Sequence, residues 1–339
     1  MLTDRQKKVL QRIIEEYVRT AEPVGSKALQ TFPELNYSSA TIRNEMAELE
    51  ELGLITKTHA SSGRVPSEAG YRVYVQAIID NRDMIHNENK DAYPVFDEIF
   101  NRTNVSREQA VKESMSIVSS LTNYASVVLG GAAYNSKIKK LQFVSLGNQY
   151  AVILMVTDQG YVESKKIVVP ETIRLSDIEK VISLLNDVLH DCPISEIEST
   201  LKQKLKDDDF LFSFDYYDEL MSVFIRAFSE MAKDKYFMAG QSKIFNQPEF
   251  TDINKVKSIL SVIEKNEIFK VVNLNESGIT VKIGQENEIK AMEDFTVITV
   301  PYENDVGERG AIAVIGPTRM DYQRVIPLLE YISDNLKKM

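Results

Sequence analysis

Cysteine, tryptophan and histidine are almost absent from this sequence of 339 residues, and that scarcity limits its chemistry. It contains one cysteine, Cys192, no tryptophan, and three histidines, His59, His86 and His190. A single cysteine cannot close a disulfide within the chain. No two histidines stand at the spacing of metal ligands near cysteine or carboxylate pairs. We therefore expect no internal disulfide, no metal site and no cofactor.

Long apolar runs are also missing. The longest, residues 151–156 and 311–315, have the length of a strand and fall far short of the roughly 20 residues that span a bilayer. The first eight residues lack the apolar stretch of a secretory signal. With 43% hydrophobic and 27% charged residues, the composition is that of a globular protein. We expect a cytoplasmic protein of two or three domains without membrane contact.

Positive charge is in deficit, since the net charge is −10. This balance argues against nucleic-acid binding by bulk electrostatics, so any such function must depend on a local surface. Residues 1–80 contain ten Lys and Arg against eleven Asp and Glu, whereas the remainder contains 30 against 39. The N-terminal segment is therefore the less acidic part. Most near-neutral domains do not bind DNA, so the motifs must decide.

Three short helices are predicted near the N-terminus. Apolar residues recur at three- and four-residue spacing over 9–18, which predicts an amphipathic helix. Residues 23–29 predict a second, short helix. Ser38 or Ser39 can cap a third, which ends at Gly53 and has an apolar face formed by Ile42, Met46 and Leu49. This order of helices is typical of a helix-turn-helix.

The opposite face of the third helix carries small and polar side chains, namely Ala40, Arg43, Asn44 and Ala47. Arg43 can donate a fork to guanine, Asn44 can pair with adenine through two hydrogen bonds, and Ala40 can touch a thymine methyl group. Ser39 and Thr41 can reach phosphates. The glutamates of this helix must then face away from the duplex. In isolation, Arg43 and Asn44 could equally be solvated residues of an ordinary surface helix.

A β-hairpin is predicted directly after this helix. Residues 54–58 have the pattern of a strand and residues 60–63 that of a turn. Between residues 57 and 65 there is no acidic residue, and the cations Lys57, His59 and Arg64 accompany serines and a glycine. These features favour contact with phosphates or a minor groove. A hairpin in this position is a wing, so residues 1–80 predict a winged helix-turn-helix DNA-binding domain. Arg72, on the next helix, is a further candidate phosphate contact.

Several segments carry a resemblance to a known family. They are EPVGS at 22–26, SATIRNEMAELE at 39–50, SSGRVPS at 61–67, GYR at 70–72, FNQPEF at 245–250 and VIGPTRMDY at 314–322. Through them the sequence resembles the HrcA heat-inducible transcription repressors, which control chaperone operons in bacteria, and the resemblance covers nearly the whole chain. It implies a homodimer that binds an inverted-repeat operator in double-stranded DNA upstream of chaperonin and DnaK operons. It also implies release on heat shock, as free GroEL-type chaperonin becomes scarce.

The resemblance further implies a GAF-like α/β domain interrupted by an inserted dimerising domain. The pattern after residue 105 agrees with an α+β multidomain protein in which strand-rich blocks flank a helical one. Helices are expected at 106–124, within 171–240 and at 322–336. Strands are expected at 125–129, 141–146, 150–157, 161–169, 268–274, 278–283, 296–300 and 311–315. We predict a linker at 81–104, the first part of the GAF-like domain at 105–170, a mainly helical inserted dimerising domain at 171–240, and the second GAF-like part at 241–339.

An aromatic stripe lies inside the predicted insertion. Its members follow a spacing of four and three residues: Phe210, Phe214, Tyr217, Met221, Phe224, Phe228 and Met231. This repeat is typical of a helix packed along a partner helix. The stripe could be the insertion's own core. Dimerisation is the sharper hypothesis, because a helix-turn-helix that binds two half-sites usually requires twofold symmetry.

Catalytic motifs are not found. There is no P-loop, no GxGxxG motif and no nucleophile elbow. The sequence His190-Asp191-Cys192 is a poor candidate for catalysis, because neighbours in sequence seldom have triad geometry. We predict that the protein is not an enzyme. One alternative is a winged-helix regulator controlled by a small-molecule effector in its GAF-like domain. Another, a metabolic enzyme with a DNA-binding appendage, would need a catalytic constellation between residues 100 and 339.

Overall fold

The computed structural model describes most of the chain in two compact units. The described residues are 2–57, 63–81, 93–102, 106–129, 136–158, 160, 162–169, 171, 174–204, 236–250, 252–264, 271–272, 278–303 and 309–338. One unit comprises Met1–Val128, Met238–Gly307 and Ala311–Met339, and the other comprises Leu129–Phe237 with Glu308–Gly310. No described helix has both the length and the apolar character needed to cross a membrane.

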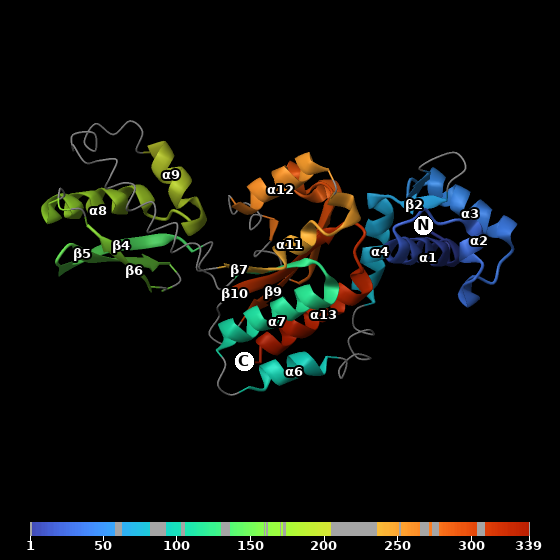
Figure 1. Ribbon diagram of the computed structural model, residues 1–339, viewed down its shortest axis with the longest axis horizontal. Helices are drawn as coiled ribbons and strands as arrows, with labels where there is room; N and C mark the ends of the chain where they lie inside the picture. Colours follow the sequence, from blue (N-terminus) through green and yellow to red (C-terminus); the bar gives the residue numbers. More distant parts are fainter. Residues whose placement is uncertain are drawn as a thin grey trace. The chain divides into compact units, whose positions relative to one another are not determined.

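The first unit begins with the winged helix-turn-helix (Figure 1). Its elements are α1 (Asp4–Thr20), α2 (Ser26–Leu29), the 3-10 turn η1 (Pro33–Leu35), α3 (Ser39–Glu51), β1 (Ile55–Lys57), β2 (Arg64–Pro66) and α4 (Glu68–Asp80). Side-chain caps begin the longer helices: Thr3 forms a capping box with Gln6, and Ser38 and Ser67 accept hydrogen bonds from the first turns of α3 and α4. The predicted order of helices followed by an antiparallel wing is confirmed.

The core of this domain lies where the apolar periodicity placed it. The buried face of α1 packs on α3, and both contribute side chains that are essentially inaccessible to solvent: Val9, Leu10, Ile13, Ile14, Ile42 and Leu49. At about 25 cal/mol per Å² of apolar surface, each such side chain contributes roughly 1.5–3 kcal/mol of transfer free energy. The domain therefore has a core of its own that fixes the orientation of α3.

The same unit contains an α/β domain built on a five-stranded sheet of order β7-β3-β10-β9-β8. The strands are β3 (Ala125–Leu129), β7 (Tyr236–Ala239), β8 (Thr280–Ile283), β9 (Phe295–Glu303) and β10 (Arg309–Pro317). The helices are α6 (Pro94–Phe100), α7 (Arg107–Thr122), α11 (Gln241–Ile244), α12 (Ile253–Glu264) and α13 (Tyr322–Leu336), with 3-10 turns η4 (Pro248–Phe250), η6 (Gly284–Glu286) and η7 (Lys290–Met292).

Helices α7 and α13 lie side by side on one face of this sheet, with α6 beneath them (Figure 1). The apolar face of α13, including Val325, Leu329, Ile332 and Leu336, is buried in the way its spacing predicts. The predicted linker at 81–104 needs correction, because residues 94–100 form α6. Phe96 and Ile99 of α6 are buried, so this segment belongs to the α/β domain.

The second unit contains a three-stranded antiparallel sheet covered by a helix. Its strands are β4 (Ile138–Gly147), β5 (Tyr150–Thr157) and β6 (Val162–Val168), followed by α8 (Leu175–Leu189), η2 (Ile194–Glu196) and α9 (Ile197–Lys204). Alternate residues of β5 are buried, and they share a core with α8 that includes Ile153, Met155, Ile178, Val181 and Leu185. The antiparallel meander is confirmed for these three strands.

The predicted domain boundary at residue 171 is wrong. Strands β4–β6 form one core with α8, so the second unit begins at Leu129 and its described part mixes a sheet with helices. In sequence this unit is inserted between β3 and β7, which are neighbours in the five-stranded sheet. The stripe from Phe210 to Met231 lies outside the described residues, as does most of the strand expected at 268–274.

Candidate nucleic-acid interface

The third helix of the winged-helix domain presents the face that its sequence predicts. Helix α3 buries Ile42, Met46 and Leu49 against the domain core. Ala40, Arg43, Asn44 and Ala47 are all exposed on its other side. Figure 1 shows α4 between the rest of this domain and the α/β domain, with α2 and α3 toward the other end. The exposed face of α3 is therefore free to enter a groove.

Arg43 and Asn44, the two predicted base-reading residues, are both exposed on this face. Arg43 Nε donates to Ser26 Oγ on α2 over 3.2 Å, and both side chains remain accessible to solvent. A neutral hydroxyl competes for a guanidinium less strongly than a carboxylate does. Arg43 can therefore exchange this contact for a guanine edge at small cost. Asn44, one residue further along the exposed face, has the two-hydrogen-bond geometry that adenine requires.

The hydroxyls at the start of α3 differ in accessibility. Ser38 is exposed and caps the helix by accepting from Thr41 N over 3.1 Å. Thr41 Oγ1 lies 2.9 Å from Ser38 Oγ, so these two hydroxyls form a pair at the helix N-terminus. Ser39 Oγ is buried and has no hydrogen-bond partner among the described residues. Ser38 and Thr41 are thus better placed to reach a phosphate than Ser39.

The acidic residues of α3 are held by neighbouring side chains. Glu45 is buried and pairs with Arg5 Nε at 3.0 Å, while Glu48 accepts a hydrogen bond of 2.6 Å from Gln6 on α1. These contacts direct two carboxylates toward α1, away from the face of Arg43. Both contacts agree with a helix whose glutamates do not share the face of Arg43.

Glu50, near the end of α3, holds both described cations of the wing. Arg64 Nε and Nη2 each lie 2.8 Å from Glu50 Oε2, and Lys57 Nζ lies 3.4 Å from Glu50 Oε1. The Arg64 side chain is only 17% exposed, whereas that of Lys57 is 45% exposed. Arg64 therefore braces the wing against α3, and Lys57 can leave Glu50 for a phosphate more readily.

The backbone also fixes the base of the wing. Arg64 and Val24 exchange backbone hydrogen bonds of 2.8 Å, which join the wing to the turn before α2. A Cβ atom at Gly63 would lie 2.5–2.6 Å from the backbone of Pro23 and Val24. Only glycine fits this close approach, so the position of the wing depends on Gly63.

Two other predicted contacts are His59 and Arg72. His59 lies outside the described residues. Arg72 is engaged with the α/β domain, where its guanidinium pairs with Glu286 and donates to Val281 O. Sequence reasoning missed the role of Glu50 in holding the wing.

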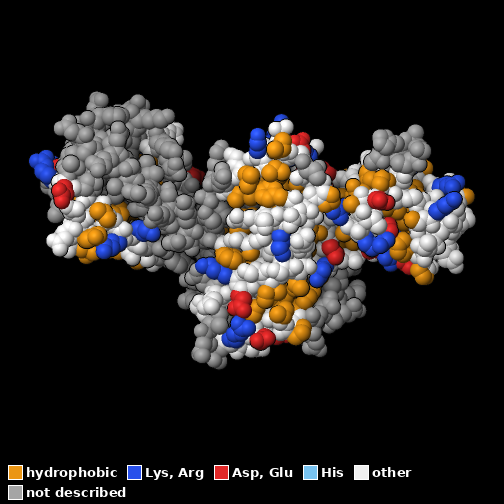
Figure 2. All heavy atoms as spheres, in the orientation of Figure 1, with side chains coloured by type: hydrophobic (Ala, Val, Ile, Leu, Met, Phe, Trp, Pro, Cys, Tyr) orange, Lys and Arg blue, Asp and Glu red, His pale blue; other side chains and the backbone are white. Residues whose placement is uncertain are grey.

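The charged surface of the winged-helix domain is mixed. Figure 2 shows Lys and Arg side chains interspersed with Asp and Glu side chains on this domain, at the right of the view. A mixed surface gives weak sequence-independent attraction to phosphates. Any affinity for DNA would therefore have to depend on a contact of matching shape at α3 and the wing.

Catalytic and metal-binding arrangements are not found among the described residues. They contain no group of three or more His, Cys, Asp or Glu that could hold a metal ion. The Cys192 thiol is buried and donates toward Pro193 O and Thr200 Oγ1, whereas the His190 ring lies 3.3 Å from Asp191. A hydrogen bond from Lys139 lowers the pKa of Asp191. His190 and Cys192 thus have separate partners.

Comparison with known proteins covers the whole chain. The family model described as "Winged helix-turn-helix transcription repressor, HrcA DNA-binding" matches residues 1–77, and "HrcA protein C terminal domain" matches residues 108–326. The heat-inducible transcription repressor HrcA of Acholeplasma laidlawii (strain PG-8A) is 41% identical over 339 residues, which cover 100% of this chain and 98% of the relative. That of Bacillus pumilus (strain SAFR-032) is 42% identical over 346 residues, covering 99% and 97%.

One solved structure has a similar fold. A crystal structure described as that of a hypothetical protein matches with a TM-score of 0.62 and 23% identity, and the match covers 100% of this chain and 98% of that one. At this identity the match supports the fold alone.

Proposed function

The chain belongs to the HrcA family of heat-inducible transcription repressors, and on that basis we propose that it represses chaperone operons by binding an inverted-repeat operator as a homodimer. The exposed face of α3 is the observation that supports the proposed DNA binding. There a base-reading pair, Arg43 and Asn44, stands on a helix whose own carboxylates are largely engaged elsewhere.

In this proposal α3 enters the major groove and the wing contacts the backbone. Arg43 and Asn44 read base edges, Ala40 allows close approach, and the hydroxyls of Ser38 and Thr41 anchor the helix N-terminus on a phosphate. Lys57 adds a backbone contact from the wing, as would His59. The small area of one helix and one wing favours binding by two copies to two half-sites.

The inserted unit supplies the dimer interface in our proposal. The stripe from Phe210 to Phe228 would pack along its counterpart in a second copy, and closed twofold symmetry would match an inverted repeat. We further propose that the five-stranded α/β domain is GAF-like. In this account the protein acts in the cytoplasm without catalysing a reaction. A GroEL-type chaperonin would favour the DNA-bound form until heat shock withdraws it.

The proposal is tested by selecting duplexes from a random pool with the full-length protein. The selected sequence should contain two inverted half-sites, and a scrambled duplex of the same composition should bind at least on the order of 10³-fold more weakly at physiological salt. A reconstituted transcription reaction should then be repressed only from a template that carries the selected site. Recovery of no common sequence would contradict the proposed function.

A second candidate function has a specific observation in its favour. A half-open cleft of about 490 Å³ lies where α1 and α4 meet the ends of α7 and α13, with Tyr74, Tyr124, Asp321 and Arg324 in its lining. Its volume falls in the range of small-molecule sites. A regulator that responds to an effector here would show a ligand-dependent rise in melting temperature. Thr122→Trp, which fills the cleft, should abolish that rise.

A further inference from the structure

The winged-helix domain is joined to the α/β domain by a junction with polar and aromatic contacts. On the DNA-binding side the junction comprises Glu15, Val18, Glu68, Arg72 and the rings of Tyr71 and Tyr74. On the α/β side it comprises Glu249, Val281, Gly284, Gln285, Glu286, Arg319, Tyr322 and Gln323. These contacts join residues far apart in sequence.

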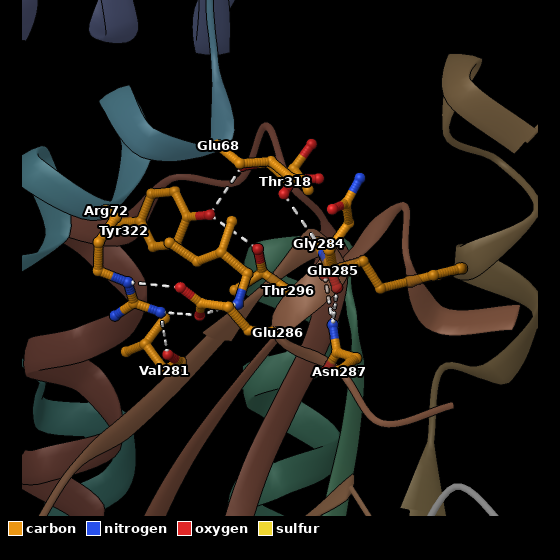
Figure 3. Close-up of polar contacts among 12 residues, drawn as sticks. Glu68, Arg72, Val281, Gly284, Gln285, Glu286, Asn287, Thr296, Thr318 and Tyr322 are labelled. Carbon is orange, nitrogen blue, oxygen red and sulfur yellow. Dashed lines mark hydrogen bonds and ion pairs between the residues drawn. The ribbon is translucent and has the colours of Figure 1, made fainter. Parts of the chain in front are cut away.

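Arg72 of α4 carries the first polar contact across the junction. Its Nε donates to Glu286 Oε1 over 2.9 Å, and its Nη2 donates to Val281 O over 2.5 Å and also to Glu286 Oε2 (Figure 3). Glu286 Oε2 in turn accepts from Ile283 N over 2.8 Å. The carboxylate is therefore held on both sides. A guanidinium that donates through two nitrogens to a fixed carboxylate restrains the direction of the contact as well as its distance.

Glu68, one turn before Arg72 on α4, carries the second contact. Its Oε2 accepts from Gln285 N at 3.4 Å, and a Cβ at Gly284 would lie 2.1 Å from its Oε1 (Figure 3). Gly284 also has a φ of +56°, which a side chain disfavours. Asn287 anchors this turn by donating to Gly284 O, Met292 O and Phe295 O. The turn that receives α4 is thus rigidly built.

Arg319 crosses the junction in the opposite direction. Its Nη1 donates to Val18 O near the C-terminus of α1 over 2.7 Å, while its Nε pairs with Glu249 at 2.6 Å. The side chain is only 13% exposed. Burial is the largest single influence and lowers the pKa of Arg319, but the hydrogen bond to Glu249 and the charges of Glu249 and of neighbouring tyrosines together raise the pKa overall. The guanidinium therefore stays charged and holds an otherwise free carbonyl of α1.

Aromatic rings fill the space between the two arginine contacts. The ring of Tyr322 lies 5.9 Å from that of Tyr71 and 6.4 Å from that of Tyr74, and all three are buried. The Tyr322 hydroxyl is 2.8 Å from Thr296 Oγ1 and donates to Thr318 O. Packed rings between two anchored arginines resist both sliding and rotation.

From these contacts we infer that Arg72, Glu286 and Arg319 are positioning residues that fix the orientation of the DNA-binding domain, and so set the half-site spacing the protein accepts. The inference rests on the proposed function, because spacing has meaning only for a dimer on two half-sites. A rigid connection makes the effective concentration of the second domain high at one spacing and low at others. A loose connection would flatten that dependence.

The test uses the full-length protein and the operator that it selects from random duplexes. Base pairs are inserted between the half-sites, up to roughly 10 bp, and affinity is measured by fluorescence anisotropy. A half-turn insertion of about 5 bp points the second half-site away from the first. The wild type should lose affinity on the order of tenfold there. For Arg72→Ala and Glu286→Gln, the same insertion should lower affinity only about threefold relative to the best spacing. At the best spacing itself, each variant should bind more weakly than the wild type.

Controls separate positioning from folding. Arg102 is a matched arginine of the α/β domain outside the junction, 41% exposed against 34% for Arg72, and it also pairs with carboxylates, Glu98 and Glu113. Arg102→Ala should keep the wild-type spacing profile. The double variant of Arg72 and Glu286 should lose less than the sum of the two single variants, because both single variants remove the same ion pair. Circular dichroism verifies that each variant is folded, and the isosteric Glu286→Gln serves if Arg72→Ala does not fold.

The outcomes distinguish the inference from its premise. A wild-type spacing profile in both Arg72→Ala and Glu286→Gln would overturn the positioning role while leaving repression by a dimer intact. A flat profile in the wild type itself would contradict binding to two half-sites and, with it, both the proposed function and this inference. A profile that flattens in the junction variants and not in Arg102→Ala supports the inference.

Discussion

Lys57 and Arg64 should affect DNA binding in different ways, although both are wing cations paired with Glu50. Lys57 is 45% exposed and its Nζ lies 3.4 Å from the carboxylate, so this pair contributes only about 0.5 kcal/mol after solvent screening. A phosphate can therefore replace Glu50 as its partner. Arg64 is 17% exposed and places two nitrogens 2.8 Å from one oxygen, so we expect it to stay with Glu50.

The expected magnitudes follow from counterion release. Each phosphate contact to duplex DNA contributes about 0.9 to the slope of log K against log salt. Raising the salt from 50 to 200 mM weakens DNA binding by both proteins. The factor by which affinity falls should be roughly three to four times smaller for Lys57→Ala than for the wild type. Arg64→Ala should leave the slope unchanged. It should lower the free energy of unfolding by about 1 kcal/mol, because Glu50 loses its better-buried partner.

The assay is fluorescence anisotropy with operator and scrambled duplexes across that salt range, combined with thermal unfolding. Lys337 provides a matched control, since it is 51% exposed and pairs with Asp334 at 2.8 Å near the end of α13. Lys337→Ala should keep the wild-type slope. An unchanged slope in Lys57→Ala would remove Lys57 from the interface. A slope lowered equally by Arg64→Ala would refute the bracing role of Arg64.

Three further predictions concern stability and assembly. Gly284→Ala should lower the free energy of unfolding by roughly 1–2 kcal/mol through its positive φ, with only a small further loss, because the Glu68 carboxylate that the Cβ meets is the end of a flexible side chain and can move aside. Gly278→Ala, with a φ of +90° in open space, should show only the backbone cost in thermal unfolding. Burial raises the pKa of Tyr71 and Tyr322 above the ordinary 10.0, so their contribution to the unfolding free energy should hold up to about pH 10 and fall above it. The tyrosinate absorbance of these two residues, obtained as the difference from Tyr71→Phe and Tyr322→Phe, should rise only on unfolding. Titration of these tyrosines in the folded protein would contradict their burial. Met221→Glu should give a monomer by sedimentation with the winged-helix domain still folded, and a folded dimer would place the interface elsewhere.

Local signals account for the parts of the fold that could be predicted. The caps Thr3 and Ser67 and the apolar spacing of α1 and α3 act over a few residues, so they specify the winged-helix elements directly. The apolar spacing of α13 specifies that helix in the same way. In each case the residues that define the element lie within the element itself or next to it.

Long-range pairing accounts for the parts that could not be predicted. A strand pattern does not reveal which sheet the strand joins, so the sequence alone places β4–β6 in the α/β domain, whereas in the structure they share a core with α8. Arg72 looked like a phosphate contact because its partner, Glu286, is 214 residues away in sequence. Glu50 and Arg64 are only 14 residues apart, but their pairing depends on how the hairpin folds back on α3, which a local pattern does not specify.

In our proposal, α3 reads a specific DNA sequence through Arg43 and Asn44. The most direct measurement is the ratio of affinities for the selected operator and a scrambled duplex, determined for the wild type, Arg43→Ala and Asn44→Ala. Each bidentate pair provides about 1–3 kcal/mol of discrimination, so each variant should lose roughly 5- to 150-fold of that ratio. Because both side chains are exposed, thermal stability should change by no more than about 0.5 kcal/mol. An affinity ratio that stays at the wild-type value in both folded variants would contradict the account.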